Sequence, residues 1–236
     1  MIHVQRFLAF SLLLAGILLP HRAASAPKDA QPSPLIVVSE NVHVSVGPKM
    51  ALIVGRYWYQ YVPALDDPSA LIPIHYAAFV PKDVTERDDL LEVTQVKLEL
   101  GEREFRPQGA RLLDLQELGA MQAMPDDARV AWFTFMIPRD LARLRFDVLI
   151  SHFQPHYTHA GKTVAAYWPW LPQLEPFRKE LELKDIDFVI TVEALPGAAI
   201  APLSNNTAVR EKSEKKWVLH PRHLENIAVE VTAARE

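Results

Sequence analysis

Apolar and polar residues alternate along most of the chain after residue 34. Val42, Val44 and Val46 fall on one face of a predicted strand, with polar His43 and Ser45 on the other. The same alternation, or an enrichment in β-branched and aromatic residues, predicts further strands: Leu52–Val62, Leu71–Val80, Glu92–Leu100, Val130–Ile137, Leu144–Phe153, Thr163–Trp168, Ile186–Ala194, Lys216–Leu219 and Ile227–Thr232. Helical spacing is confined to Leu112–Met124 and Leu174–Leu183. The pattern predicts an all-β protein with minor helix, arranged as an antiparallel β-sandwich.

Three local signals place individual strands within the predicted sheets. Pro73 cannot donate to a sheet ladder, so Leu71–Val80 is predicted at an edge. Val130–Ile137 is apolar on both faces and is predicted as a central strand. Gly101–Glu102 forms the expected turn of a hairpin that ends with Arg103–Arg106.

A short internal similarity leaves two arrangements open. Phe79–Val84 resembles Met136–Leu141, and each follows an apolar strand. Duplication of a β-domain would give an N-terminal half at 35–111 and a C-terminal half at 129–236, both immunoglobulin-like, joined by a helix or linker at 112–128. The alternative is a single β-sandwich in which strands ending in Pro-basic-Asp share a common turn chemistry.

The N-terminus has the pattern of a secretory signal peptide at residues 1–25. Arg6 precedes an apolar run from Phe7 to Leu19, and small residues after Pro20 allow cleavage after Ser25. The apolar run is shorter than the ~20 residues that span a bilayer, so cleavage is expected and stable membrane insertion is not. Residues 26–34 form a Pro-rich leader. The predicted location is the periplasm or the extracellular space.

Composition removes several classes of function. The chain of 236 residues has no cysteine, which excludes disulfides and thiolate sites, and its formal net charge of -4 provides no basic surplus for nucleic acid. Nucleophile-elbow, phosphate-loop and His-Glu-x-x-His motifs are absent from the sequence. The chain therefore reads as an exported, soluble β-rich binding or interaction module without a recognisable catalytic motif, with a protein or a carbohydrate as partner and no cofactor.

Aromatic residues form the first candidate site. They lie in two groups, one on an alternating strand and one further along the chain: Tyr57, Tyr59 and Tyr61, then Tyr167, Trp168 and Trp170. On an exposed face they would form a platform that stacks on sugar rings or anchors a protein partner. On a buried face they would belong to the hydrophobic core.

Histidines form the second candidate site and give an alternative function. His152, His156 and His159 surround a predicted strand-to-strand loop, and His220 and His223 form a pair near the C-terminus. Without thiols, a transition-metal site would have to use imidazoles and carboxylates, which suit zinc or copper. If these side chains converge, the chain is a metal-binding protein or a metal-dependent enzyme; the alternative is a set of polar loop residues.

Overall fold

The structure is a computed structural model that describes residues 35–61, 70–113, 124–142, 145–167, 187–202, 209–212, 215–219 and 227–233. Its strands are β1 (Leu35–Val46), β2 (Met50–Tyr61), β3 (Leu71–Pro81), β4 (Lys97–Leu100), β5 (Arg103–Phe105), β6 (Gly109–Leu112), β7 (Ala128–Pro138), β8 (Arg145–Pro155), β9 (Tyr157–His159), β10 (Lys162–Tyr167), β11 (Asp187–Ala194), β12 (Ala198–Pro202), β13 (Val209–Lys212), β14 (Lys216–Leu219) and β15 (Ile227–Ala233). The described helices are α1 (Arg87–Thr94) and a 3-10 turn at Arg139–Leu141.

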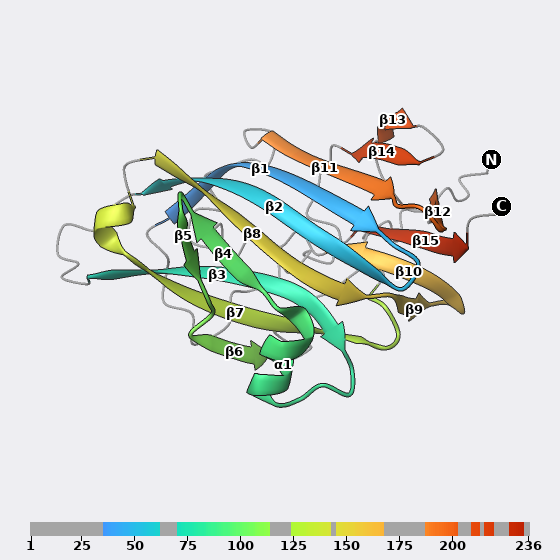
Figure 1. The fold of residues 1–236 in the computed structure, drawn as a ribbon, viewed down its shortest axis with the longest axis horizontal. Helices are drawn as coiled ribbons and strands as arrows, with labels where there is room; N and C mark the ends of the chain where they lie inside the picture. The colour runs from blue at the N-terminus through green and yellow to red at the C-terminus, as the bar shows by residue number, and fades with distance from the viewer. Residues whose placement is uncertain are drawn as a thin grey trace, which may run out of the picture.

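The strands form three sheets (Figure 1). The large sheet has eight strands in the order β13-β14-β11-β1-β2-β8-β4-β5. A four-stranded sheet has the order β12-β15-β10-β9, and a three-stranded sheet has the order β3-β7-β6. Neighbouring strands are antiparallel except for β1 and β11, which run parallel.

The main hydrophobic core is shared by all three sheets. One face of the large sheet, which we call its inward face, contributes Val44, Ile53 and Val148. Phe133 of the three-stranded sheet and Val229 of the four-stranded sheet belong to the same buried cluster. The opposite face of the large sheet, its outward face, points away from this core because side chains alternate along each strand.

The all-β prediction with minor helix is confirmed, as are several strand positions. β3, which carries Pro73, is the edge of its sheet, and β7 is the central strand. β4 and β5 form the predicted hairpin, and Gly101 occupies a left-handed conformation (φ 60°) in its turn.

The structure differs from the sequence prediction at α1, which overlaps the start of the strand predicted at Glu92–Leu100. The helix places Leu90 and Thr94 on one buried face, and the Thr94 hydroxyl donates to the Leu90 carbonyl oxygen at 2.7 Å. Asp88 and Asp89 lie in its first turn, where negative charge is favourable. Of the helix predicted at Leu112–Met124, the first residue is the last residue of strand β6, and residues 114–123 lie outside the described residues. The helix predicted at Leu174–Leu183 also lies outside them.

The two halves predicted at 35–111 and 129–236 do not build separate sheets. In the large sheet, β8 lies between β2 and β4, and β11 pairs with β1. In the three-stranded sheet, β7 lies between β3 and β6. Strands from both sides of residues 112–128 are therefore interleaved in the same hydrogen-bonded ladders.

Candidate functional site

A bulge in β1 turns an acidic side chain into the core. Leu35 and Val37 point inward, but the register with β2 shifts between Val37 and Ser39. An extra residue reverses which positions of a strand face inward, so Glu40 is buried with Val42. Glu40 is only 1% exposed, which is unusual for a carboxyl group.

Gly55 makes space for an aromatic ring that lies opposite Glu40. Gly55 and Tyr57 lie on the same face of β2, and a Cβ atom at position 55 would come within 2.5 Å of the Tyr57 ring. A side chain at position 55 would therefore exclude the observed Tyr57 conformation. Tyr57 pairs with Glu40 across the β1–β2 ladder and is 1% exposed.

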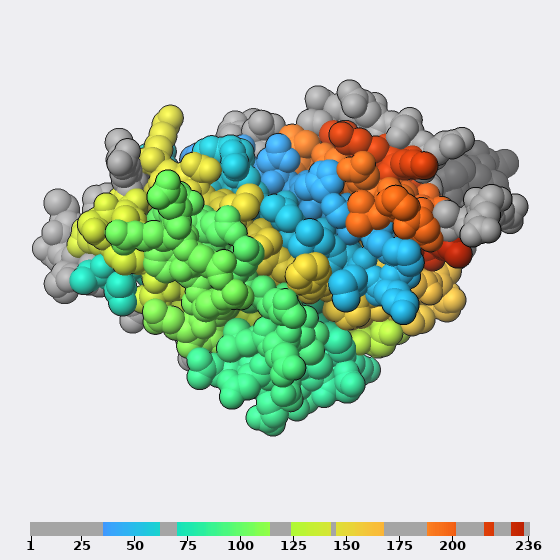
Figure 2. Space-filling model, viewed as in Figure 1, coloured from blue at the N-terminus to red at the C-terminus, as the bar shows by residue number. Residues whose placement is uncertain are grey.

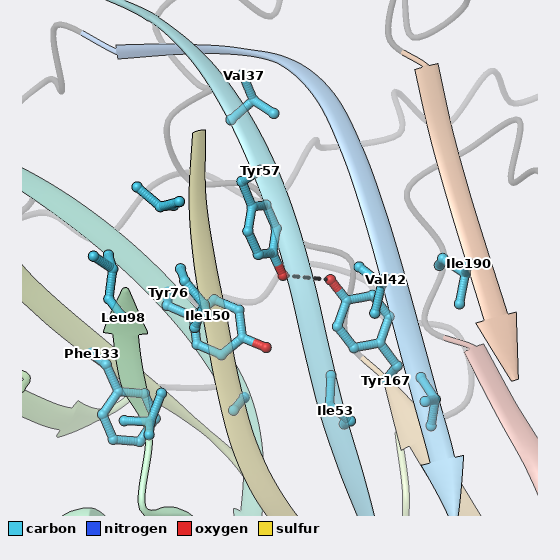
Figure 3. Packing of buried hydrophobic residues seen from close by; sticks show 14 of the residues in the cluster. Val37, Val42, Ile53, Tyr57, Tyr76, Leu98, Phe133, Ile150, Tyr167 and Ile190 are labelled. Atoms are coloured by element: carbon cyan, nitrogen blue, oxygen red, sulfur yellow. Dashed lines mark hydrogen bonds between the residues drawn. The ribbon is translucent and has the colours of Figure 1, made fainter. Parts of the chain in front are cut away.

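Hydroxyl groups connect these residues into what we call the interior polar network, made of Glu40, Tyr57, Tyr76, His152 and Tyr167. The Tyr167 hydroxyl donates to Glu40 Oε1, and the Tyr57 and Tyr167 hydroxyl oxygens are 3.1 Å apart. Figure 3 shows the Tyr57 and Tyr167 rings, from β2 and β10, turned toward each other in the core. The Tyr76 hydroxyl lies 3.1 Å from His152 Nδ1, and the Tyr57 and Tyr76 rings meet edge-on with centroids 6.1 Å apart.

The network links all three sheets. Glu40, Tyr57 and His152 belong to the large sheet, Tyr76 to the three-stranded sheet and Tyr167 to the four-stranded sheet. A further side chain of β8 ties the large sheet to β10, because Gln154 Nε2 donates to the Ala166 carbonyl oxygen. Directional polar contacts of this kind fix how the sheets pack against each other.

Burial dominates the electrostatics of the network. It raises the pKa of Glu40 to about 8, against a smaller lowering by the Tyr167 hydrogen bond. Burial lowers the pKa of His152 to about 4, and the pKa values of Tyr57 and Tyr167 are raised well above their usual range. At neutral pH the network therefore consists of uncharged groups.

Two atoms of the network lack hydrogen-bond partners among the described residues. They are Glu40 Oε2 and His152 Nε2, and the two residues are only 1% and 2% exposed. A buried polar atom without a partner costs about 1–3 kcal/mol. The network is thus a costly feature of this core, and the cost is concentrated at Glu40 and His152.

The outward face of the large sheet carries an apolar cluster instead. Met50 pairs with Pro155, and Leu52 pairs with Phe153, on the adjacent strands β2 and β8. We call these four residues the apolar tetrad. Met50 is 50% exposed and Phe153 is 38% exposed, while Leu52 and Pro155 are half-buried. In Figure 2 this face is turned toward the viewer, with β1 and β2 (blue) between β11 (orange) and the β4–β5 hairpin (green).

Charged groups flank the tetrad on the same face. Arg56 Nε lies 3.6 Å from Asp147 Oδ2, and the Arg56 guanidinium lies 5.9 Å from the centre of the Trp58 ring. On the neighbouring strands, His43 Nε2 is 3.2 Å from Glu193 Oε2. The outward face therefore combines an apolar centre with side chains of both charges.

The structure divides the predicted aromatic site. Tyr57, Tyr59, Tyr61 and Tyr167 are all buried, with exposures of 1%, 1%, 7% and 3%, so these four form no exposed platform. The odd-numbered positions of β2 face the other two sheets, and only Trp58 of this aromatic run points outward. Trp168 and Trp170 lie outside the described residues.

The structure does not bring the described histidines together. His152 is buried against Tyr76. His159, in β9, has its Nδ1 atom 3.3 Å from the carbonyl oxygen of Met124, a loop residue. Burial lowers the pKa of His156. Within the described ranges, no three His, Asp or Glu side chains are grouped so that they could hold a metal ion. His220 and His223 lie outside those ranges, so their part of the zinc or copper hypothesis stays a prediction.

Sequence reasoning missed Glu40 and Tyr76. From Glu40 onward, the even-numbered residues of β1 face inward instead of the odd-numbered ones. The sequence gives no local sign of this change, because Ser39 and Glu40 are both polar. Gly55 did carry a signal: a single glycine inside a β-branched and aromatic strand indicates close approach of another group.

Known proteins offer little further guidance. No protein family matches the sequence, and no curated protein matches it. The fold is similar to part of leukotriene A4 hydrolase from Saccharomyces cerevisiae, with a TM-score of 0.41 and 7% identity over 89% of this chain and 32% of that one. It is also similar to part of an M1 zinc metallopeptidase from Deinococcus radiodurans, with a TM-score of 0.37 and 10% identity over 84% of this chain and 42% of that one. The chain thus spans less than half the length of either structure, and the likeness assigns neither a family nor an activity.

One observation concerns membranes. The helices of the described part of the chain include none long and apolar enough to cross a bilayer.

Proposed function

We propose that this chain is an exported β-rich module that binds a protein partner through the outward face of its large sheet. The apolar tetrad supports this proposal most directly. Water-exposed apolar surface is unfavourable, and an apolar patch surrounded by polar residues is typical of a protein interaction site. We expect the partner to present a bulky apolar side chain to the tetrad.

The surroundings of the tetrad favour a protein over other ligands. Protein interfaces are enriched in Met, aromatic residues and Arg, and their rims are polar. Met50 and Phe153 supply the centre, and the Arg56–Asp147 pair supplies flanking groups of both charges, with His43 and Glu193 as further polar groups. We infer that the partner carries charged residues of both signs on either side of its apolar side chain.

A carbohydrate is the less favoured ligand because of Trp58. Sugar recognition on a sheet uses exposed aromatic ring faces. On β2, the aromatic residue that points outward and could stack on a sugar is Trp58. The Arg56 guanidinium lies over its ring. A sugar would have to displace this cation before it could stack.

Export rests on the sequence of residues 1–25. We propose cleavage after Ser25, and N-terminal sequencing of the protein recovered from the periplasm of a bacterial host would then begin at Ala26. Recovery of the chain with its first 25 residues intact in the membrane fraction would contradict this proposal.

Peptide selection tests the binding face without a known partner. A random-peptide phage library is panned on the wild-type protein, and recovered peptides are measured against Phe153→Asp. We expect peptides with a central Leu, Ile, Phe or Met, and a loss of affinity of about tenfold or more in the variant, since a charge would enter the apolar contact.

Val93→Asp provides the matched control. Val93 is 36% exposed, close to the 38% of Phe153, but lies on α1 rather than on the outward face. It should leave peptide affinity unchanged. Peptides that bind equally well to wild type and Phe153→Asp would overturn the proposed face.

A further inference from the structure

Glu40 lies directly beneath the proposed binding face. Along β2, Arg56 and Trp58 point outward, and Tyr57 between them points inward. Across the β1–β2 ladder, Asn41 pairs with Arg56 and Glu40 pairs with Tyr57. A displacement of the Glu40–Tyr57 pair would therefore move the backbone that carries Arg56 and Trp58.

The surroundings of Glu40 suit an uncharged carboxyl group. The titratable groups that face it are phenols: Tyr57 and Tyr59 from β2, Tyr76 from β3 and Tyr167 from β10. From β11, its register partner is the apolar Phe188. Burial and the Tyr167 hydrogen bond are the influences on its pKa, so no cation of the described residues offsets a charge there.

The strand around Glu40 is also a weak point of the large sheet. The bulge between Val37 and Ser39 interrupts the β1–β2 ladder one residue before Glu40. Bulged positions lose regular pairing. Opening the ladder there would let water reach the carboxyl group at a lower cost than in the regular part of β1.

We propose that Glu40 is a proton-controlled switch: when its carboxyl group releases a proton to solvent, β1 opens at the bulge and the outward face changes shape at Arg56 and Trp58. The protonated carboxyl group fits the closed core, where Oε1 accepts the Tyr167 hydrogen bond. The carboxylate has one donor and an unpartnered Oε2, and it requires water or further donors that the closed core lacks among the described residues. The switch rests on the proposed function in that the outward face is the surface it controls.

Burial of Glu40 sets the direction and the range of the pH dependence. Burial raises the pKa of Glu40 to about 8, so the closed form prevails at neutral pH and the open form above about pH 8. Peptides selected at neutral pH are selected on the closed form. They should therefore bind the outward face more weakly at about pH 9 than at about pH 7, because less of the protein is then in the closed form.

The test follows the Trp58 indole N–H resonance by NMR in the free protein from about pH 6 to about pH 9.5. The resonance is assigned with Trp58→Phe, and Trp217, which is buried on the inward face two strands from β1, serves as the internal reference. We expect Trp58 to titrate with a midpoint near 8 and Trp217 to change little.

Two variants make the assignment to Glu40 specific. Glu40→Gln keeps the shape but cannot ionise, and it should abolish the Trp58 titration. Tyr167→Phe removes a hydrogen bond that the closed, protonated form makes and the open form lacks, so the closed form is less stable and the midpoint should move to lower pH. The second variant keeps the proposal testable if the first does not fold.

Several results would overturn the switch. These are a Trp58 resonance that does not titrate in the wild type, a titration that persists in Glu40→Gln, or a midpoint that rises in Tyr167→Phe. The titration needs no ligand, so its failure leaves the binding face untouched. Conversely, a normal titration together with peptides that ignore Phe153→Asp would overturn the proposed function alone.

Discussion

The two faces of the large sheet depart from the usual distribution of residues in opposite directions. The inward face buries a carboxyl group, an imidazole and phenols, in the interior polar network. The outward face exposes Met50 and Phe153, at 50% and 38%. Strand β2 contributes to both faces: Gly55 and Tyr57 point inward, whereas Leu52 and Trp58 point outward.

The difference separates two kinds of constraint. Buried polar groups cost stability unless they are fully hydrogen-bonded, and exposed apolar groups cost solubility unless something covers them. On the inward face, the network fixes the packing of three sheets and adds a titratable group. On the outward face, the tetrad contributes little to the core, which is why we assign it to binding.

The largest contrast should come from the same substitution in the shared core and on the outward face of the large sheet. Phe133 is fully buried on β7, and Phe133→Ala should reduce the free energy of unfolding by about 3–5 kcal/mol, since it leaves a cavity in the shared core. Phe153→Ala should reduce it by less than about 1 kcal/mol, because the side chain already contacts water. Urea denaturation of both variants measures the difference. Equal losses would mean that Phe153 is part of the core and not of an exposed face.

Close packing at Gly55 gives the next effect. Gly55→Ala places a Cβ atom within 2.5 Å of the Tyr57 ring, so Tyr57 must move and its hydroxyl must leave Tyr167. Overpacking of this kind costs about 1–3 kcal/mol in the free energy of unfolding. Gly109→Ala in β6 is the control, because its Cβ atom would meet Thr134 at an ordinary 3.8 Å. A Gly55→Ala variant as stable as the control would show that Tyr57 does not lie over Gly55.

These contrasts also show what the sequence could predict. Enrichment in β-branched and aromatic residues is enough to identify the strand at β2, whose residues 50 to 61 alternate between its two faces in the structure. It could not identify the inward face, because Tyr57 and Trp58 suit either environment. Glu40 was out of reach for a different reason: its burial depends on a bulge, which is a property of strand pairing and not of local composition.

Long-range pairing was also beyond the reach of the sequence. The interleaving of β8 between β2 and β4 joins residues that are far apart in sequence, and no local pattern encodes it. The error at α1 is local: the alternation of Glu92–Leu100 predicted a strand, but its residues 92 to 94 belong to the helix. The acidic first turn at Asp88 and Asp89 was the available signal for a helix.

The pH dependence of stability should show the polar face directly. The pKa of Glu40 is raised from 4.5 to about 8, so its contribution to stability is fully present below pH 4.5 and is lost as the pH rises to about 8. The pKa values of His75 and His152 are lowered from 6.5 to about 4, so their contribution is present above pH 6.5 and is lost as the pH falls toward 4. Stability should therefore be highest near pH 6.5.

Above this maximum, Glu40 dominates. Unfolding free energy should fall by ~1.4 kcal/mol per pH unit between pH 6.5 and 8, or ~2 kcal/mol in all. Urea denaturation across this range measures the slope, and Glu40→Gln should flatten it because the variant cannot bind the extra proton. A slope that survives in Glu40→Gln would assign the pH dependence to another group.

The smallest effect should come from the outward ion pair. Arg56 and Asp147 have side-chain exposures of 55% and 51%, and a pair so open to solvent contributes less than about 0.5 kcal/mol to stability. A double-mutant cycle of Arg56→Ala and Asp147→Ala by urea denaturation should therefore give a coupling free energy near zero, even though the Arg56–Tyr57–Trp58 backbone lies over the polar network. A coupling above about 1 kcal/mol would mean that solvent is excluded from this face even without a partner. The contrast between a water-exposed outward face and a buried polar inward face would then fail at the residues where the two are closest.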